Sequence, residues 1–200
     1  MSPVDISPVH ASADPFPSRR AILLGAAGVT LLGAGAGVAH GLWKRKDLSA
    51  RFFNSFSISH FELPPIEGLK DAQGAPVPGL SDRDLADKRC LLNLWASWCP
   101  SCREEHAWLT KIAEQTHAPL YGANVKDQPA RARAFLERRG NPFAAVGADS
   151  RTFLERALGA KGVPATFVIG PGYKIEVALY DPLDKDNVAN LILPALARVD

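Results

Sequence analysis

The sequence predicts an α/β domain, a central sheet with helices on both faces, behind an apolar N-terminal segment. Between residues 90 and 199, apolar runs of strand length alternate with segments of helical periodicity, which is typical of a sheet covered on both faces. Residues 21–43 contain no Asp, Glu, Lys or Arg, and 23 residues are enough to cross a bilayer as a helix. The 200 residues suffice for one domain with a sizeable core and an extension.

Composition divides the chain into a disordered tail, an apolar segment, a linker and a folded domain, at residues 1–20, 21–43, 44–55 and 56–200. The apolar segment is a transmembrane anchor or a signal segment. We favour an uncleaved anchor, but six glycines lower its hydrophobicity, and Gly37-Val38-Ala39 is a candidate cleavage site. The flank Ser18–Leu23 also resembles a twin-arginine export signal, so the export route stays open.

The formal net charge of +2 lies in the N-terminal part of the chain. Residues 1–46 carry a net charge of +3, so the remainder carries −1. A nearly neutral domain has no electrostatic footprint for nucleic acid, and we expect no nucleic-acid partner. Basic residues are more numerous after the apolar segment than before it, which alone would leave the domain in the cytoplasm by the positive-inside rule.

The first half of the domain is expected to lead into one buried strand. Phe56–Leu63 alternates loosely and predicts a first strand, followed by a connection rich in Pro and Gly. Ser81 is placed to cap a short helix through Ala86. Cys90–Ala96 is an apolar run of strand length, as expected of a central parallel strand, with Cys90 as a small buried hydrophobe.

Helices and strands are expected to alternate over the rest of the domain. The first helix is expected over Pro100–Gln115, and its buried face at Ala107, Trp108, Ile112 and Ala113. Glu104 and Glu105 in its early turns suit the helix dipole as solvated charges. Further strands are expected at residues 120–125, 143–146, 166–169 and 174–180. Further helices are expected at 129–139 before Gly140, at 150–158 capped by Ser150, and at 186–199 with an interruption at Pro194.

Cys99 and Cys102 lie at the junction between the buried strand and the helix that follows it. At a helix N-terminus, unpaired backbone N–H groups and the dipole favour a thiolate, which makes Cys99 the candidate nucleophile. Pro100 suits the first helical turn, where a missing N–H costs no hydrogen bond. Cys102 returns to the same helical face within disulfide reach and is the candidate resolving thiol.

A C-x-x-C pair has other uses, which this sequence supports less well. Haem attachment needs His directly after the second Cys, where this chain has Arg103. A structural zinc site needs four ligands, but beyond the pair the domain offers only Cys90 and scattered histidines. An inert disulfide is the remaining alternative. The favoured interpretation of the pair is a catalytic dithiol, which requires no metal and no organic cofactor.

The segment W-A-S-W-C-P-S-C-R-E-E-H, residues 95–106, resembles the thioredoxin superfamily, and most closely the periplasmic thiol:disulfide interchange proteins of the DsbE/CcmG type that serve cytochrome c maturation. Residues 162–167 resemble that family's G-x-P-x-T-F segment, and residues 124–127 resemble its N-x-K-D segment. The resemblance covers residues 56–198. One position departs from it, because the family usually has Glu after the proline and this chain has Ala165.

The resemblance implies a thioredoxin-like fold, here with an additional helix–strand insertion. It implies that Pro164 is cis, faces the dithiol and holds the backbone of the substrate. We expect Trp98, Pro100, Ser101 and Val163 to contact the partner. The resemblance also places the redox domain in the periplasm, on a single-pass inner-membrane anchor, against the tendency of the flanking charges.

The expected function is reduction of a disulfide in apocytochrome c or in a thiol protein of cytochrome c maturation, with electrons from a membrane donor of the DsbD/CcdA type. The chain has no room for the all-helical insertion of DsbA-type oxidases, which favours a reductase. The alternatives are a general TlpA-like reductase, a peroxide-handling redoxin, whose usual T-x-x-C site is absent, and a non-catalytic thioredoxin-fold interaction module. The intact Cys pair argues against the last of these.

Overall fold

The structure is a computed structural model and describes residues 60–198. The predicted tail, apolar segment and linker, and the start of the predicted first strand, lie outside these residues. Among residues 60–198, no helix has both the length and the apolar character that crossing a membrane requires.

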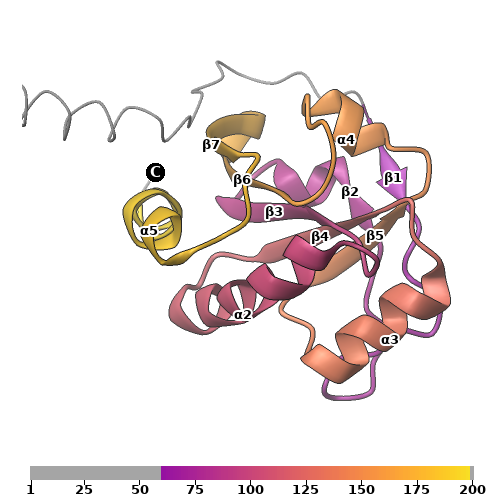
Figure 1. Cartoon of the computed structure of the whole chain (residues 1–200). Helices are drawn as coiled ribbons and strands as arrows, with labels where there is room; N and C mark the ends of the chain where they lie inside the picture. The colour runs from indigo at the N-terminus through magenta and orange to yellow at the C-terminus, as the bar shows by residue number, and fades with distance from the viewer. Residues whose placement is uncertain (1–59, 199–200) are drawn as a thin grey trace, which may run out of the picture. The chain divides into compact units, whose positions relative to one another are not determined.

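A five-stranded mixed sheet forms the centre of the domain (Figure 1). Its strands are, in spatial order, β5 (Ala145–Asp149), β4 (Leu120–Val125), β3 (Cys90–Trp95), β6 (Ala165–Gly170) and β7 (Lys174–Leu179). β3, β4 and β5 pair in parallel, whereas β6 and β7 run antiparallel to their neighbours. A separate antiparallel pair joins β1 (Glu62–Leu63) to β2 (Leu80–Ser81).

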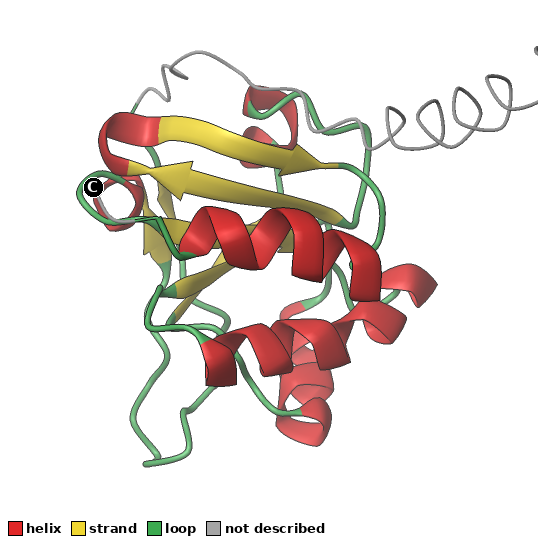
Figure 2. Cartoon of the chain, turned by 90° about the vertical axis from the view of Figure 1, so that its left-hand side faces the viewer, coloured by secondary structure: helices red, strands yellow, loops and turns green. Residues whose placement is uncertain are grey.

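Helices cover both faces of the sheet, as the alternating sequence predicts. One face packs against α2 (Pro100–Gln115), α3 (Pro129–Arg139) and the C-terminal helical segment, and Figures 1 and 2 show α2 and α3 on the same side of the sheet. The other face packs against β1, β2, the 3-10 turn η1 (Asp82–Leu85) and α4 (Phe153–Ala157). The α3–β5 unit is the predicted insertion, and it adds β5 as an edge strand.

Strand β3 supplies both layers of the core because successive side chains point to opposite faces. Leu91 and Trp95 pack in the layer under α2, while Leu92 and Leu94 pack in the layer under α4. Cys90 is fully buried in the α4 layer, as expected of a small hydrophobe. All six residues of β3 are buried, which confirms a central strand.

Helix α2 has the predicted bounds but a different buried face. Its buried residues are Cys102, Glu105, His106, Leu109 and Ile112. Of the predicted face only Ile112 is fully buried, whereas Trp108 is half-buried and Ala107 exposed. The spacing of three and four residues from Cys102 onward shows that the face carrying the dithiol is the face that packs on the sheet.

Helix α4 and strand β5 differ from the prediction at their ends. Helix α4 begins at Phe153, not at 150, because the buried Asp149 carboxylate accepts hydrogen bonds from the N–H groups of Phe153 (2.6 Å) and Leu154 (2.9 Å). Asp149 therefore caps the helix instead of Ser150. The strand before it extends to Asp149, three residues further than predicted.

The C-terminal segment consists of three short pieces: α5 (Lys185–Asn187), a π-helical turn (Val188–Ile192) and α6 (Leu193–Leu196). The widened turn comes directly before α6, whose second residue, Pro194, has no N–H to donate to the preceding turn. Another 3-10 turn, η2 (Pro171–Tyr173), joins β6 to β7.

Candidate active site

The cysteine pair lies at the N-terminus of α2. Cys99 is the N-cap residue, with extended φ/ψ, and its Sγ accepts a hydrogen bond from the N–H of Cys102 at 3.1 Å. Pro100 occupies the first helical turn. The two cysteines form a disulfide with a Cα–Cα distance of 5.3 Å, so the structure holds the oxidised pair. Both side chains are buried, and access to them depends on the loops around the helix end.

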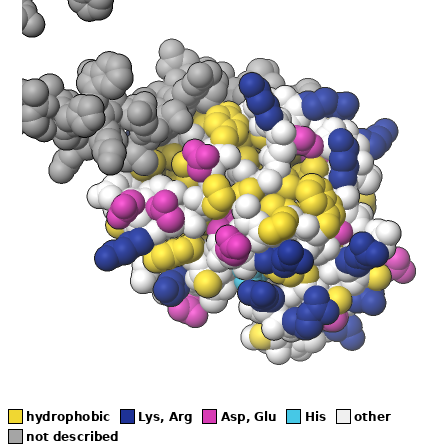
Figure 3. All heavy atoms as spheres, in the orientation of Figure 1, with side chains coloured by type: hydrophobic (Ala, Val, Ile, Leu, Met, Phe, Trp, Pro, Cys, Tyr) yellow, Lys and Arg dark blue, Asp and Glu magenta, His cyan; other side chains and the backbone are white. Residues whose placement is uncertain are grey.

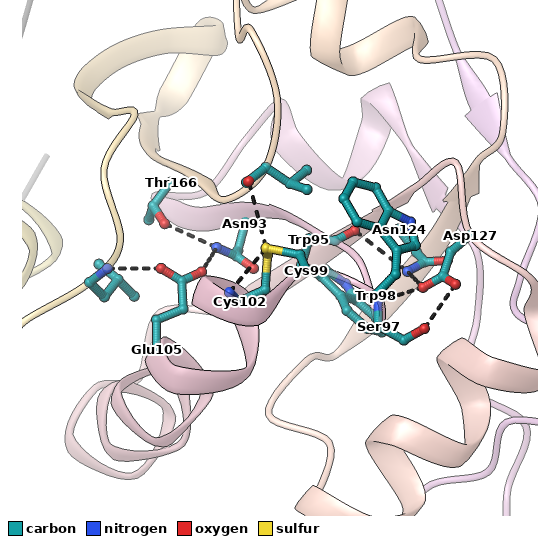
Figure 4. The surroundings of a disulfide bond; sticks show 12 residues. Asn93, Trp95, Ser97, Trp98, Cys99, Cys102, Glu105, Asn124, Asp127 and Thr166 are labelled. Atoms are coloured by element: carbon teal, nitrogen blue, oxygen red, sulfur yellow. Dashed lines mark hydrogen bonds between the residues drawn. A yellow bond between two sulfur atoms is a disulfide. The ribbon is translucent and has the colours of Figure 1, made fainter.

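The loop before β6 lies against the dithiol. The Val163–Pro164 peptide bond is cis, and the carbonyl oxygen of Val163 lies 3.6 Å from Cys99 Sγ (Figure 4). Pro164 is buried, whereas Val163 is half-buried beside the sulfur. A substrate chain that reaches Cys99 must therefore pass this loop, which is where the predicted contact with its backbone would form.

Trp98 stands at the rim of the site with 51% of its surface exposed. Its indole Nε1 donates a hydrogen bond to the carbonyl oxygen of Lys126, at 3.0 Å, in the loop after β4. Lys126 has a φ of 47°, in the left-handed region. Of the other predicted contact residues, Pro100 is exposed and Ser101 half-buried. The rim of the dithiol is therefore tied to a loop that lies far from it in sequence.

Asp127 fastens the same two loops together. Its carboxylate accepts hydrogen bonds from Ser97 N (2.5 Å), Ser97 Oγ (2.9 Å), Asn124 Nδ2 (3.0 Å) and Gln128 N (2.8 Å). Figure 4 shows Asp127 between Ser97 and Asn124, beside Trp98. The N-x-K-D segment thus has a structural role that the sequence comparison alone did not assign: it fixes the turn that presents Trp98 and Cys99.

A second polar group is buried beneath α2. Glu105 Oε1 accepts a hydrogen bond from Asn93 Nδ2 (3.0 Å), and Glu105 Oε2 accepts one from the backbone N–H of Leu183 (2.8 Å). Asn93 Nδ2 also donates to Thr166 Oγ1 at 3.0 Å. This group joins α2, the two central strands and the segment after β7, one helical turn from Cys102 (Figure 4).

The expectation that Glu105 is a solvated charge is wrong. Its side chain is only 1% exposed, and burial raises its pKa from 4.5 to about 7, against the lowering effect of the hydrogen bonds from Leu183 and Asn93. The sequence did contain a sign of this site, because Asn93 is the one polar residue within the apolar run of β3. A buried amide needs a polar partner, and Glu105 is that partner.

Ala165 does not face the dithiol. It is fully buried and packs in the α4 layer, opposite Leu94 of β3. A longer acidic side chain at this position would start from the far side of the sheet. At this position the chain therefore buries a small apolar side chain where the resembled family usually has a carboxylate.

Cys90 is remote from exchange chemistry. Burial raises the pKa of its thiol to about 12, which keeps it protonated and unreactive at neutral pH. Within residues 60–198, no three His, Cys, Asp or Glu side chains are grouped so that they could hold a metal ion.

A dithiol at a helix N-terminus, facing a cis-proline loop in this sheet topology, defines a thioredoxin-fold thiol:disulfide oxidoreductase. Comparison with known proteins agrees with that class. Residues 58–178 match the model of the AhpC/TSA family. The chain is 38% identical over 125 residues to the thiol:disulfide interchange protein HelX of Rhodobacter capsulatus, covering 62% of this chain and 70% of HelX. It is 35% identical over 151 residues to the thiol:disulfide interchange protein DsbE of Pseudomonas aeruginosa, covering 76% and 79%.

A crystal structure of a putative thiol:disulfide interchange protein DsbE from Chlorobium tepidum has the same fold, with a TM-score of 0.56 at 24% identity. The match covers 74% of this chain and all of the Chlorobium chain (100%). The chain therefore belongs to the AhpC/TSA family, among the thiol:disulfide interchange proteins of the DsbE and HelX type.

Proposed function

We propose that this protein is a periplasmic, membrane-anchored reductant of disulfides in cytochrome c maturation. The observation that carries the proposal is the Cys99–Cys102 pair at the start of α2, against the cis Val163–Pro164 loop, in a relative of DsbE and HelX. The substrate is the disulfide of a Cys-x-x-Cys-His segment in apocytochrome c, or of a relay thiol protein.

The reaction starts from the reduced dithiol. The Cys99 thiolate attacks one sulfur of the substrate disulfide, so that a mixed disulfide forms and the second substrate sulfur leaves as a thiolate. Cys102 loses its proton and attacks Cys99 Sγ, which releases the first substrate sulfur as a thiolate. The two substrate thiolates take up protons, the substrate is reduced by two electrons, and the enzyme is left with the disulfide seen in this structure.

Return to the reduced state needs two electrons from a second thiol protein, for which a membrane donor of the DsbD/CcdA type is the candidate. The donor's thiolate attacks the Cys99–Cys102 disulfide in the same manner, and the donor becomes oxidised. Residues 21–43 would anchor the domain to the inner membrane, close to both the donor and the haem-attachment apparatus.

A Cys102→Ser variant tests the substrate assignment. Without the resolving thiol, the mixed disulfide with Cys99 accumulates, and buried Cys90 does not compete for it. We expect the trapped partners to be apocytochrome c or a thiol protein of its maturation. A trap that recovers many unrelated secreted proteins, or a strongly oxidising potential in glutathione buffers, would instead favour a general thiol oxidoreductase. A Cys99→Ser variant is the control, since it lacks the attacking thiol.

Fusion of alkaline phosphatase after Asp200 tests the proposed location. The enzyme needs an oxidising compartment for its disulfides, so activity is expected only if the domain is exported. An inactive phosphatase fusion, together with a fluorescent green fluorescent protein fusion at the same position, would contradict the periplasmic location.

A further inference from the structure

Three exposed cationic side chains lie beside the dithiol on loops and helix ends that frame it. Arg103 follows Cys102 directly, and its N–H bonds to the carbonyl of Cys99 at 3.3 Å. Lys126 belongs to the loop whose carbonyl holds the Trp98 indole. Arg139 ends α3, and its guanidinium Nη1 donates to the carbonyl oxygen of Arg103 at 3.4 Å. Arg103, Lys126 and Arg139 are called the basic rim below.

The basic rim has no anionic partner within the described part of the chain. None of its three members belongs to an ion pair among residues 60–198. Asp127, the acid next to Lys126, turns its carboxylate toward Ser97, Asn124 and a backbone N–H. Glu104, the acid next to Arg103, is exposed and forms no ion pair with the basic rim within residues 60–198. Like charges held together without a counterion oppose folding slightly. Their placement at a binding site is therefore explained best by negative charges on a partner molecule.

The basic rim borders an apolar centre. Trp98 and the half-buried Val163 flank the buried sulfur atoms. Figure 3 shows hydrophobic side chains gathered at the middle of this face, with Lys and Arg side chains around and over α3. An apolar centre with a charged border is the usual anatomy of a transient protein interface, in which the border selects and orients the partner.

We propose that the partner whose disulfide Cys99 attacks carries Asp or Glu residues beside its cysteines, and that the basic rim recognises them. The inference rests on the proposed function, because it assigns the chemistry of the partner at the same site. The rim lies on the α3 side of the dithiol. Exposed acidic residues near it are Glu104 on α2, Asp181 after β7, and Glu137 on α3, which already pairs with Arg133 at 3.7 Å. Lys126 and Arg139, before and at the end of α3, would orient the acidic flank of the partner toward α3.

Single-turnover reduction of three peptides tests the inference. The peptides share one Cys-x-x-Cys-His disulfide and differ only in flanking residues, which are Glu, Gln or Lys. Each peptide is mixed with reduced full-length protein. Its rate constant is then divided by the rate constant for reduction of the same peptide by dithiothreitol, which corrects for the intrinsic reactivity of each disulfide. At low salt we expect the Glu peptide to react about tenfold faster than the Lys peptide, since charge steering changes association rates by about tenfold or more.

Charge variants locate the effect. Arg103→Glu, Lys126→Glu and Arg139→Glu should each reduce the preference for the Glu peptide, and the Gln replacements should reduce it less. Lys174→Glu is the matched control, because Lys174 is exposed and pairs with Gly170 at the opposite end of the sheet from Pro164. The preference should also shrink as salt shortens the Debye length from about 10 Å at 0.1 M to about 3 Å at 1 M.

The outcomes separate the two proposals. Equal corrected rates for the three peptides, or a loss of preference in Lys174→Glu equal to that in the rim variants, would overturn the role of the basic rim and leave reduction of the Cys-x-x-Cys-His disulfide standing. Failure to reduce any of the peptides would instead count against the proposed function.

Discussion

Replacing Glu105 with Gln should change how the stability of this protein depends on pH. The pKa of Glu105 is raised from 4.5 to about 7, so in this range the folded chain holds a proton that the unfolded chain has lost. The contribution of Glu105 to stability therefore falls as pH rises from about 4.5 to about 7, and is constant above that. One pKa unit corresponds to about 1.4 kcal/mol, so the ionised carboxylate costs about 3 kcal/mol at pH 8.

The Glu105→Gln variant can keep the hydrogen bonds of the site. Its amide oxygen can accept a hydrogen bond from the N–H of Leu183. Asn93 Oδ1 has no hydrogen-bond partner within residues 60–198, and once the Asn93 amide is turned over, the new NH₂ can donate to it. The variant therefore imitates the protonated acid. Relative to the wild type it should gain about 3 kcal/mol between pH 4.5 and pH 8.

Urea unfolding of the oxidised proteins measures this difference. With a slope of about 1–3 kcal/mol per molar urea, the gain corresponds to a relative shift of the midpoint by about 1–3 M. Glu104→Gln is the matched control, because it makes the same change at the exposed neighbouring position and should leave the pH profile unaltered. Parallel profiles for the wild type and Glu105→Gln across this pH range would refute the reasoning.

Three further substitutions probe the surroundings of the dithiol. Asp127→Ala leaves Ser97 N without its acceptor, so urea unfolding should show a free energy of unfolding lower by about 1–3 kcal/mol. Stopped-flow mixing should show slower exchange at Cys99, and unchanged kinetics would contradict the positioning role. Ala165→Glu should move the titration midpoint of the Cys99 thiol to higher pH. Ala165→Gln, which is equal in size, should lower the Tm without moving that midpoint, and thiolate absorbance against pH distinguishes the two variants. Asp149→Ala removes the cap of α4 and should lower the free energy of unfolding by about 1 kcal/mol, measured by urea titration, and identical midpoints would argue against the cap.

The sequence predicts the fold well because local patterns and topology agree in this chain. The apolar run of β3, the proline after Cys99 and the glycine after Arg139 each mark an element boundary that the structure keeps. Fold-level rules then leave few ways to arrange alternating strands and helices around one sheet. The position of Cys99 at the helix start follows from the same local pattern.

Contacts between distant segments are what the sequence could not predict. The role of Glu105 depends on Asn93, twelve residues earlier, and on Leu183, 78 residues later. The cap of α4 was misplaced because Ser150 and Asp149 are both good caps, and only the turn geometry, with Thr152 at a φ of 57°, selects Asp149.

Because the Trp98 indole bonds to the carbonyl oxygen of Lys126, the position of the ring does not depend on which side chain stands at position 126. A contact with the side chain would link the two. Any amino acid that tolerates the left-handed backbone at position 126 can hold the indole in place, since only the peptide group takes part. The side chain there can therefore change sign or size while the ring next to Cys99 stays where it is. A single substitution at such a position could therefore change which partner protein is recognised while the hydrogen bond that holds Trp98 is kept.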